Sequence, residues 1–147
     1  QKKVDQLASQ LFEQQQKVVS LTAYKVLSIE LAAGLGHTFY DNETDYETVY
    51  FDQEIQHDFA SWVSGDSMEP KYHNGSVALI RETGFDSDGA VYAVVCNNQT
   101  YIKRVYREEG GLRLVSINPK YKDIYLSYDE DPRVVGIIVG NFVPMEG

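Results

Sequence analysis

A serine in a predicted tight turn is the residue best suited to do chemistry in this sequence. Ser67 lies in the segment Ser64-Gly-Asp-Ser-Met-Glu-Pro70, directly after an apolar, strand-like run at Phe59 to Val63. A serine where a strand enters a turn exposes its hydroxyl beside outward-pointing backbone N–H groups, as a nucleophile and its oxyanion hole require. The commoner role of such a serine is in a turn or at a helix N-cap. The fixed φ of Pro70 predicts a short helix or 3₁₀ segment after Ser67.

Lys103 is the candidate base for that hydroxyl. It lies in an alternating run, residues 99–107, in which Tyr101, Lys103 and Val105 share one face of a predicted strand. If this face points to the core, the loss of water favours the neutral amine and lowers the pKa of Lys103, so the amine can accept a proton. The alternative is a lysine on the solvent face of an edge strand. The pattern places none of the three histidines beside Ser67: His37, His57 and His73.

Strand-like runs that would position these residues fill most of the chain from Thr48 onward. The runs are rich in Val, Ile, Tyr and Phe and are separated by turn-forming residues. They are Val49 to Phe51, Phe59 to Val63, Ser76 to Arg81, Ala90 to Cys96, Tyr101 to Arg107, Leu112 to Ile117 and Arg133 to Phe142. Short turns between the three strands from Ala90 to Ile117 predict an antiparallel meander. The last strand is apolar on both faces, which fits a buried strand or a dimer contact.

A different pattern precedes these strands. Apolar residues at a 3-4 spacing predict a helix over residues 1–21: Val4, Leu7, Leu11, Val18 and Leu21. This is either a linker helix or a short coiled coil, which the central Gln14 would weaken. A further strand is predicted at Ala23 to Leu27. The segment from Leu31 to Gly36 consists mostly of Ala and Gly, and we expect it to be flexible and sterically open.

The composition fits one ordinary domain with a real core. The chain has 147 residues, 43% of them hydrophobic, and its longest apolar run is too short to span a bilayer. The single cysteine, Cys96, excludes an internal disulfide, and with three histidines we expect no structural zinc site. No motif predicts a cofactor. Without a basic, apolar leader we expect a cytoplasmic protein, and without an initiator Met we expect a fragment whose N-terminal part is missing.

Negative charge is concentrated in one stretch of the chain. The formal net charge is −9, and residues 41–58 contain seven acidic residues and no Lys or Arg. Such a surface repels phosphate backbones, so this part of the protein is predicted to bind nucleic acid poorly by itself. We interpret the stretch as a solvated edge whose charges oppose strand pairing. A docking surface for a basic partner is the alternative.

Taken together, these motifs resemble the C-terminal domain of LexA-like and lambda-repressor-like transcriptional regulators, a family of self-cleaving serine–lysine proteases. The resemblance covers roughly residues 28–143. Four motifs carry it in order and spacing: the cleavage site at Ala32-Ala33-Gly34, the nucleophile motif at Ser64 to Pro70, the base strand at Tyr101 to Val105, and the following loop at Ser116 to Tyr121. The resemblance implies a mainly β fold, a LexA-like or signal-peptidase-like antiparallel β domain with an N-terminal linker helix.

The resemblance also implies a mechanism for cutting the chain's own Ala33–Gly34 bond. Ser67 would attack the Ala33 carbonyl, neutral Lys103 would take the serine proton, and the backbone N–H groups of Asp66 and Ser67 would hold the oxyanion. Because bond and nucleophile share one chain, two brakes are expected: the cost of deprotonating Lys103, and a cleavage segment that mostly lies away from Ser67. Contacts of the substrate segment are implied for Leu31, Ala32 and Met68.

The same resemblance implies partners. Residues 1–27 would be the linker helix and connection from a missing helix-turn-helix domain that binds operator DNA, and residues 28–147 would be the autoprotease and dimerisation domain. Cleavage would separate the two and end the avidity of the homodimer. A RecA–single-strand DNA filament of the SOS response, or a phage-encoded inducer of a prophage repressor, would activate cleavage, and no membrane is involved. The alternatives are a non-proteolytic dimerisation and partner-sensing module and a UmuD-like polymerase accessory subunit.

Overall fold

The computed structural model describes residues 20–29, 33 and 46–145 of the chain. Within these residues, nine strands form one sheet. They are β1 (Thr22–Val26), β2 (Glu47–Phe51), β3 (Phe59–Trp62), β4 (Val77–Glu82), β5 (Val91–Cys96), β6 (Gln99–Glu108), β7 (Gly111–Val115), β8 (Ile124–Ser127) and β9 (Arg133–Phe142). A short 3₁₀ helix, η3 (Tyr128–Glu130), precedes β9. None of the helices in the described residues has the length and apolar character needed to cross a membrane.

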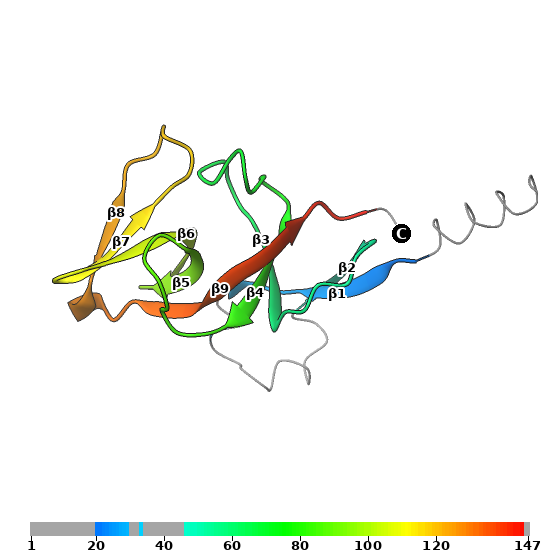
Figure 1. Cartoon of the computed structure of the whole chain (residues 1–147), viewed down its shortest axis with the longest axis horizontal. Helices are drawn as coiled ribbons and strands as arrows, with labels where there is room; N and C mark the ends of the chain where they lie inside the picture. The colour runs from blue at the N-terminus through cyan, green and yellow to red at the C-terminus, as the bar shows by residue number, and fades with distance from the viewer. Residues whose placement is uncertain (1–19, 30–32, 34–45, 146–147) are drawn as a thin grey trace, which may run out of the picture.

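The strand order in the sheet is β2-β1-β3-β4-β9-β5-β6-β7-β8. Neighbouring strands are antiparallel except β1 and β3, which are parallel and meet at Val26 and Ala60. Figure 1 shows β9 running through the middle of the molecule, with β1 and β2 at one end and β7 and β8 at the other. β9 is therefore a central strand, and both of its edges are paired, with β4 and with β5.

Three clusters of buried side chains stabilise the sheet. The first packs beneath the loop between β3 and β4 and includes Met68 and Ile102. The second joins β5 to β8 and includes Tyr92 and Leu114, and the third lies under β1, β4 and β9 and includes Leu79. The first four residues of β4 are all buried, which explains why this strand is a continuous apolar run rather than an alternating one.

The sequence patterns predict eight of the nine strands, and the mainly β fold is confirmed. The meander is confirmed in β5, β6 and β7, and β8 extends it. The short strand β8 is missing from the prediction; its residues Ile-Tyr-Leu-Ser are strand-like, but the run is only four residues long and follows a polar segment. The helix predicted over residues 1–21 lies outside the described residues, apart from Ser20 and Leu21, which are not helical. β1 is already part of the sheet, and the boundary between linker and domain stays a prediction.

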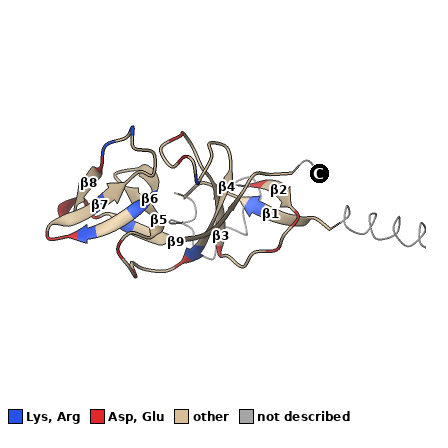
Figure 2. Cartoon of the chain, turned by 45° about the horizontal axis from the view of Figure 1, so that its top comes forward, with Lys and Arg blue, Asp and Glu red and all other residues tan. Residues whose placement is uncertain are grey.

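The described part of the acidic stretch lies at one edge of the sheet. β2 is the edge strand, and it pairs only with β1 among the described strands. Its acidic residue and those of the loop after it are exposed: Glu47, Asp52, Glu54 and Asp58. Figure 2 colours the acidic residues red along the ribbon. This arrangement agrees with the interpretation of the stretch as a solvated edge whose charges oppose further strand pairing.

Candidate active site

Ser67 lies in the loop between β3 and β4, and the backbone of that loop sets its position. Gly65 has φ +82°, a left-handed conformation that favours glycine, and it turns the chain just before Ser67. The Glu69 N–H then donates to the Asp66 carbonyl at 3.2 Å. The segment forms isolated turns, so the short helix or 3₁₀ segment predicted after Ser67 is wrong. Pro70 has no N–H, and it cannot supply a bond that would extend the turn into a helix.

Lys103 lies on β6, inside the sheet. Because β6 pairs with β5 on one side and with β7 on the other, the alternative of an edge strand is wrong. The Lys103 side chain is 7% exposed, and its neighbours Ile102 and Val105 are buried. Burial lowers the pKa of Lys103, because the charged ammonium group loses its water. A hydrogen bond joins Lys103 Nζ to Ser67 Oγ, so the structure brings together the two side chains singled out in the sequence.

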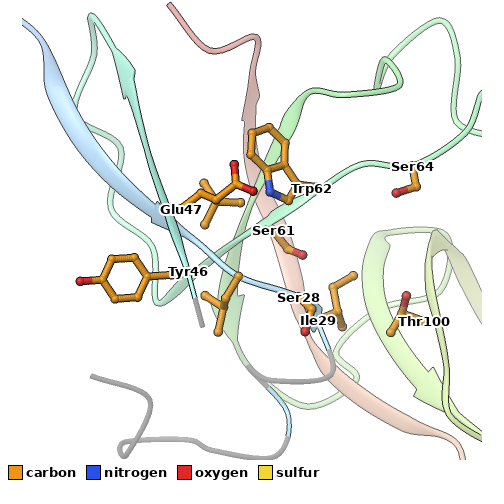
Figure 3. A pocket seen from close by; sticks show the side chains of 10 residues that line it. Ser28, Ile29, Tyr46, Glu47, Ser61, Trp62, Ser64 and Thr100 are labelled. Carbon is orange, nitrogen blue, oxygen red and sulfur yellow. The ribbon is translucent and has the colours of Figure 1, made fainter. Parts of the chain in front are cut away.

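A groove leads away from this pair of side chains. A cavity of about 100 Å³ lies over the pair and is also lined by Met68 and Ile102. It adjoins a cavity of about 400 Å³, and the two share four lining residues: Ile29, Trp62, Ser64 and Thr100. Figure 3 shows the larger cavity, with Tyr46 and Glu47 at the end away from Ser64 and Thr100. The Ser67 hydroxyl thus faces one end of a groove with mixed polar and apolar walls.

Ala33, the one described residue of the implied cleavage site, is not brought to this groove. Ala33 packs against the first core cluster and lines a separate cavity of about 500 Å³ together with Phe59, Glu82 and Arg133. It is not among the residues that line the cavity at Ser67. Met68, in contrast, lies beside Ser67 and is 2% exposed. The other residues of the implied segment lie outside the described residues: Leu31, Ala32 and Gly34.

The loop after β7, residues 116–123, holds the Ser67 turn from one side. The Asn118 N–H donates to the Ser67 carbonyl at 2.9 Å, and Asn118 Nδ2 donates to the Asp66 carbonyl at 3.0 Å. The Tyr121 hydroxyl donates to the Asp66 carboxylate, and this bond, assisted by Lys120, holds the pKa of Asp66 below its usual value. The same bond raises the pKa of Tyr121. The sequence marks this loop by the motif Ser116 to Tyr121, but no residue pattern in it predicts these contacts.

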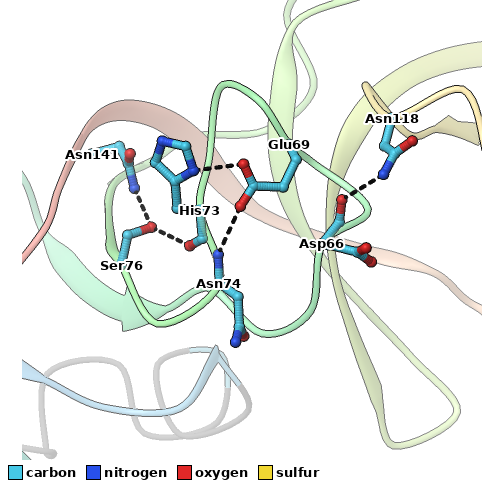
Figure 4. Close-up of polar contacts among 7 residues, drawn as sticks. All are labelled: Asp66, Glu69, His73, Asn74, Ser76, Asn118 and Asn141. Atoms are coloured by element: carbon cyan, nitrogen blue, oxygen red, sulfur yellow. Dashed lines mark hydrogen bonds and ion pairs between the residues drawn. The ribbon is translucent and has the colours of Figure 1, made fainter.

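A second polar network anchors the other side of the same loop. Glu69 Oε2 pairs with His73 Nδ1 at 2.5 Å, and the other Glu69 oxygen accepts from the Asn74 N–H at 3.3 Å. The Ser76 hydroxyl donates to the His73 carbonyl at 2.6 Å and accepts from Asn141 Nδ2 at 2.8 Å. Figure 4 shows this network on one side of the loop and the Asn118 bond on the other. The Ser67 loop is therefore tied both to the end of β9 and to the loop after β7.

The mainly β fold agrees with the class of protein that a comparison with known families identifies. Residues 25–139 match the Peptidase S24-like family, and the chain belongs to it. The chain is similar to the LexA repressor of Clostridium perfringens strain SM101, with 33% identity over 79 residues, 53% of this chain and 37% of the relative. For the LexA repressor of Citrifermentans bemidjiense the identity is 33% over 86 residues, 57% and 43% of the two chains. For that of Oleidesulfovibrio alaskensis it is 26% over 83 residues, 56% and 40%. The resemblance to LexA-like regulators is confirmed, and the chain spans less than half the length of these curated relatives.

Proposed function

We propose that this chain is the C-terminal domain of a transcriptional repressor, and that it inactivates the repressor by cutting its own Ala33–Gly34 bond. The observation that carries the proposal is the hydrogen bond between Ser67 Oγ and the buried Lys103 Nζ. Lysine is almost never fully buried in proteins, and shifted pKa values gather at functional sites. Membership of a peptidase family and similarity to LexA repressors support the same function.

The proposed reaction uses Ser67 as the nucleophile and Lys103 as the general base. Neutral Lys103 takes the Ser67 proton while Oγ attacks the Ala33 carbonyl carbon. The N–H groups of Asp66 and Ser67 stabilise the oxyanion of the tetrahedral intermediate. The intermediate collapses, Lys103 gives its proton to the departing amine of Gly34, and an ester of Ala33 with Ser67 remains. Water, with Lys103 again as the base, then releases Ala33.

Two features would restrain this reaction in the resting protein. Burial lowers the pKa of Lys103 and favours the neutral amine, but the protonated form of this amine cannot act as a base. Ala33 lines a cavity separate from the one at Ser67, so its carbonyl has to move before attack. A partner that favours the docked position of this segment would therefore accelerate cleavage by shifting a population. In the proposal this partner is a RecA–single-strand DNA filament or a phage-encoded inducer.

The proposal includes a homodimer that holds two operator-binding domains together. Apolar side chains near the C-terminal end support an interface in this region. Val143 and Met145 follow β9 and are exposed, and the Met145 N–H donates to the carbonyl of the exposed Tyr50 at 2.8 Å. Because both edges of β9 are already paired, the contact would involve the residues after β9 rather than the strand itself. Cleavage at Ala33 would then detach the operator-binding domains from the dimer.

A second candidate function is a non-proteolytic module that dimerises the repressor and senses a partner. The place of Ala33 in its own cavity favours this candidate, since a segment that never reaches Ser67 is not cut. Induction by a partner in a Ser67→Ala protein, without any cleavage, would support it.

Three single variants test the proposed reaction against this alternative. The chain and its variants are incubated at pH 10, and intact masses are measured over time. The unchanged chain should give residues 1–33 and 34–147, whereas Ser67→Ala and Lys103→Ala should remain whole. Lys122→Ala is the matched control, because Lys122 is exposed, and it should cut like the unchanged chain. Cutting that survives the Ser67 or the Lys103 substitution would remove the assigned pair.

A further inference from the structure

Asn118 makes hydrogen bonds to two consecutive peptide groups of the Ser67 turn. Its Nδ2 donates to the Asp66 carbonyl at 3.0 Å, and its backbone N–H donates to the Ser67 carbonyl at 2.9 Å. The side-chain amide is itself fixed, because Asn118 Oδ1 accepts from the Lys120 N–H at 3.0 Å. Figure 4 shows the Asn118 amide reaching the Asp66 carbonyl from outside the Ser67 loop. One residue therefore holds the backbone on both sides of the Ser67 Cα.

The bond to the Asp66 carbonyl also fixes an N–H group. The Asp66 carbonyl and the Ser67 N–H belong to one planar trans peptide group, so they point in opposite directions. The Asn118 amide holds this oxygen together with the Glu69 N–H, which donates to it at 3.2 Å, and fixing the oxygen sets the direction of the Ser67 N–H. A hydrogen bond accepted by the carbonyl also polarises the peptide group and strengthens its N–H as a donor. In the proposed reaction, the Ser67 N–H is one of the two donors that stabilise the oxyanion.

The same loop controls the Asp66 carboxylate. A negative charge one residue before the nucleophile would repel a developing oxyanion. The Tyr121 hydroxyl donates to this carboxylate and so fixes its place. The Tyr121 N–H donates to the Asn118 carbonyl at 3.2 Å, so both contacts come from a single turn. The loop after β7 thus holds the carbonyl and the carboxylate of Asp66 at the same time.

We propose that Asn118 is a positioning residue for the cleavage reaction: by holding the Asp66 carbonyl, it directs the Ser67 N–H at the oxyanion. The inference rests on the proposed function and deepens it. Asn118 contacts backbone groups here, whereas the proton passes between the side chains of Ser67 and Lys103. Loss of the Asn118 amide should therefore slow cleavage without moving the pH at which Lys103 loses its proton.

Two substitutions of Asn118 test this role. Asn118→Ala keeps the backbone N–H and loses the side-chain donor. Asn118→Asp keeps the acceptor for the Lys120 N–H, replaces the donor to Asp66 with an oxygen and adds a negative charge there. Because loss of an entire oxyanion donor costs about 10²–10³ in rate, a misdirected donor should cost about tenfold or more. We expect the plateau rate at high pH to fall by this factor in both variants, while the midpoint of the pH profile of Asn118→Ala stays unchanged.

Asn74→Ala is the matched control. Asn74 Oδ1 accepts from the Gly65 N–H at 2.8 Å, so this variant also removes one bond between a side chain and the backbone of the Ser67 loop. It leaves the Asp66–Ser67 peptide group held, and its plateau rate should stay close to that of the unchanged chain. Equal losses in Asn74→Ala and Asn118→Ala would overturn the proposal, because general loosening of the loop would explain both. An unchanged rate in Asn118→Asp would overturn it as well.

A second measurement does not require the chain to cut itself. In the reaction with a fluorophosphonate probe, Ser67 Oγ bonds to phosphorus, fluoride leaves and Lys103 takes the serine proton. The phosphoryl oxygen takes the place of the oxyanion, so Asn118→Ala should slow the labelling of Ser67 by about tenfold. Labelling without self-cleavage, slowed in Asn118→Ala, would refute the assigned scissile bond and support the role of Asn118. Equal labelling rates in the two chains, or no labelling in either, would overturn the inference.

Discussion

Raising the pH should switch on cleavage by deprotonating a single group, the Lys103 amine. Lys103 is 7% exposed on a strand paired at both edges, and its Nζ is hydrogen-bonded to Ser67 Oγ. Burial penalises the charged ammonium group and lowers the pKa of Lys103. In the proposed mechanism only the neutral amine can take the serine proton. The rate constant should therefore follow the neutral fraction of this one lysine.

The size of the effect follows from that fraction. A lysine with its ordinary pKa of about 10.4 is neutral in roughly one molecule in a thousand at pH 7.4. Below the pKa, each unit of pH multiplies the neutral fraction, and with it the cleavage rate, by about ten. Since burial lowers the pKa of Lys103, the profile should bend and level off at a pH below about 10.4.

The assay is the intact mass of the purified chain during incubation at pH values from 6 to 11. First-order rate constants are plotted against pH for the unchanged chain and for Lys103→Arg. Arginine stays protonated at these pH values and cannot serve as a base, so this variant should lose a factor of about 10²–10⁴ in rate. A flat profile, a midpoint above the ordinary lysine pKa, or the same profile in Lys103→Arg would refute the assignment of Lys103 as the base.

Three further predictions concern stability. The unfolded chain holds the Lys103 proton more tightly than the folded chain, so the stability of the unchanged protein rises with pH between the lowered folded pKa and about 10.4. With Ser67→Ala in both chains, so that neither is cut at high pH, urea denaturation gives the unfolding free energy of Lys103→Met minus that of the chain with Lys103. This difference should be greatest near neutral pH and smaller toward about pH 10.4, and a difference that grows with pH would contradict this sign. Leu79→Ala empties a fully buried position on β4, and chemical denaturation should show a loss of about 2–5 kcal/mol. In Gly136→Ala the new Cβ would collide with the Arg81 carbonyl of β4, and the free energy of unfolding should fall by about 1–3 kcal/mol or more. In the control Gly84→Ala the new Cβ meets open space, and the free energy of unfolding should change by less than about 0.5 kcal/mol.

Local pattern was sufficient to predict most strands but not their order. The alternation around Lys103 and the continuous apolar run of β4 are properties of neighbouring residues, so they can be read from the sequence. The place of β9 between β4 and β5, and the parallel contact of β1 with β3, depend on contacts between segments far apart in the chain. Nothing in the residues of β9 specifies which strands will flank it, and its apolar faces fit a dimer contact equally well.

In the candidate site, too, the sequence predicts the local features but not the contacts between distant segments. The sequence predicts Ser67 and Lys103 as site residues, because a serine in a turn and a lysine on an apolar strand face are local features. The structure adds the hydrogen bond between them. The contacts of Asn118 with Asp66 and Ser67 cross between two loops, so no local pattern reveals them. The position of Ala33 in a separate cavity is equally a property of the folded chain. The small side chain of Ala33 suits close approach to Ser67, but it does not predict where the segment lies in the folded chain.

The central claim is that the hydroxyl of Ser67, with the neutral amine of Lys103, cuts the bond between Ala33 and Gly34 of the same molecule. The most direct test is intact mass spectrometry of the purified chain aged at pH 10, at two protein concentrations that differ about a hundredfold. Residues 1–33 and 34–147 should accumulate at the same first-order rate in both samples. A chain that stays whole, cuts elsewhere, or cuts faster at the higher concentration would contradict it.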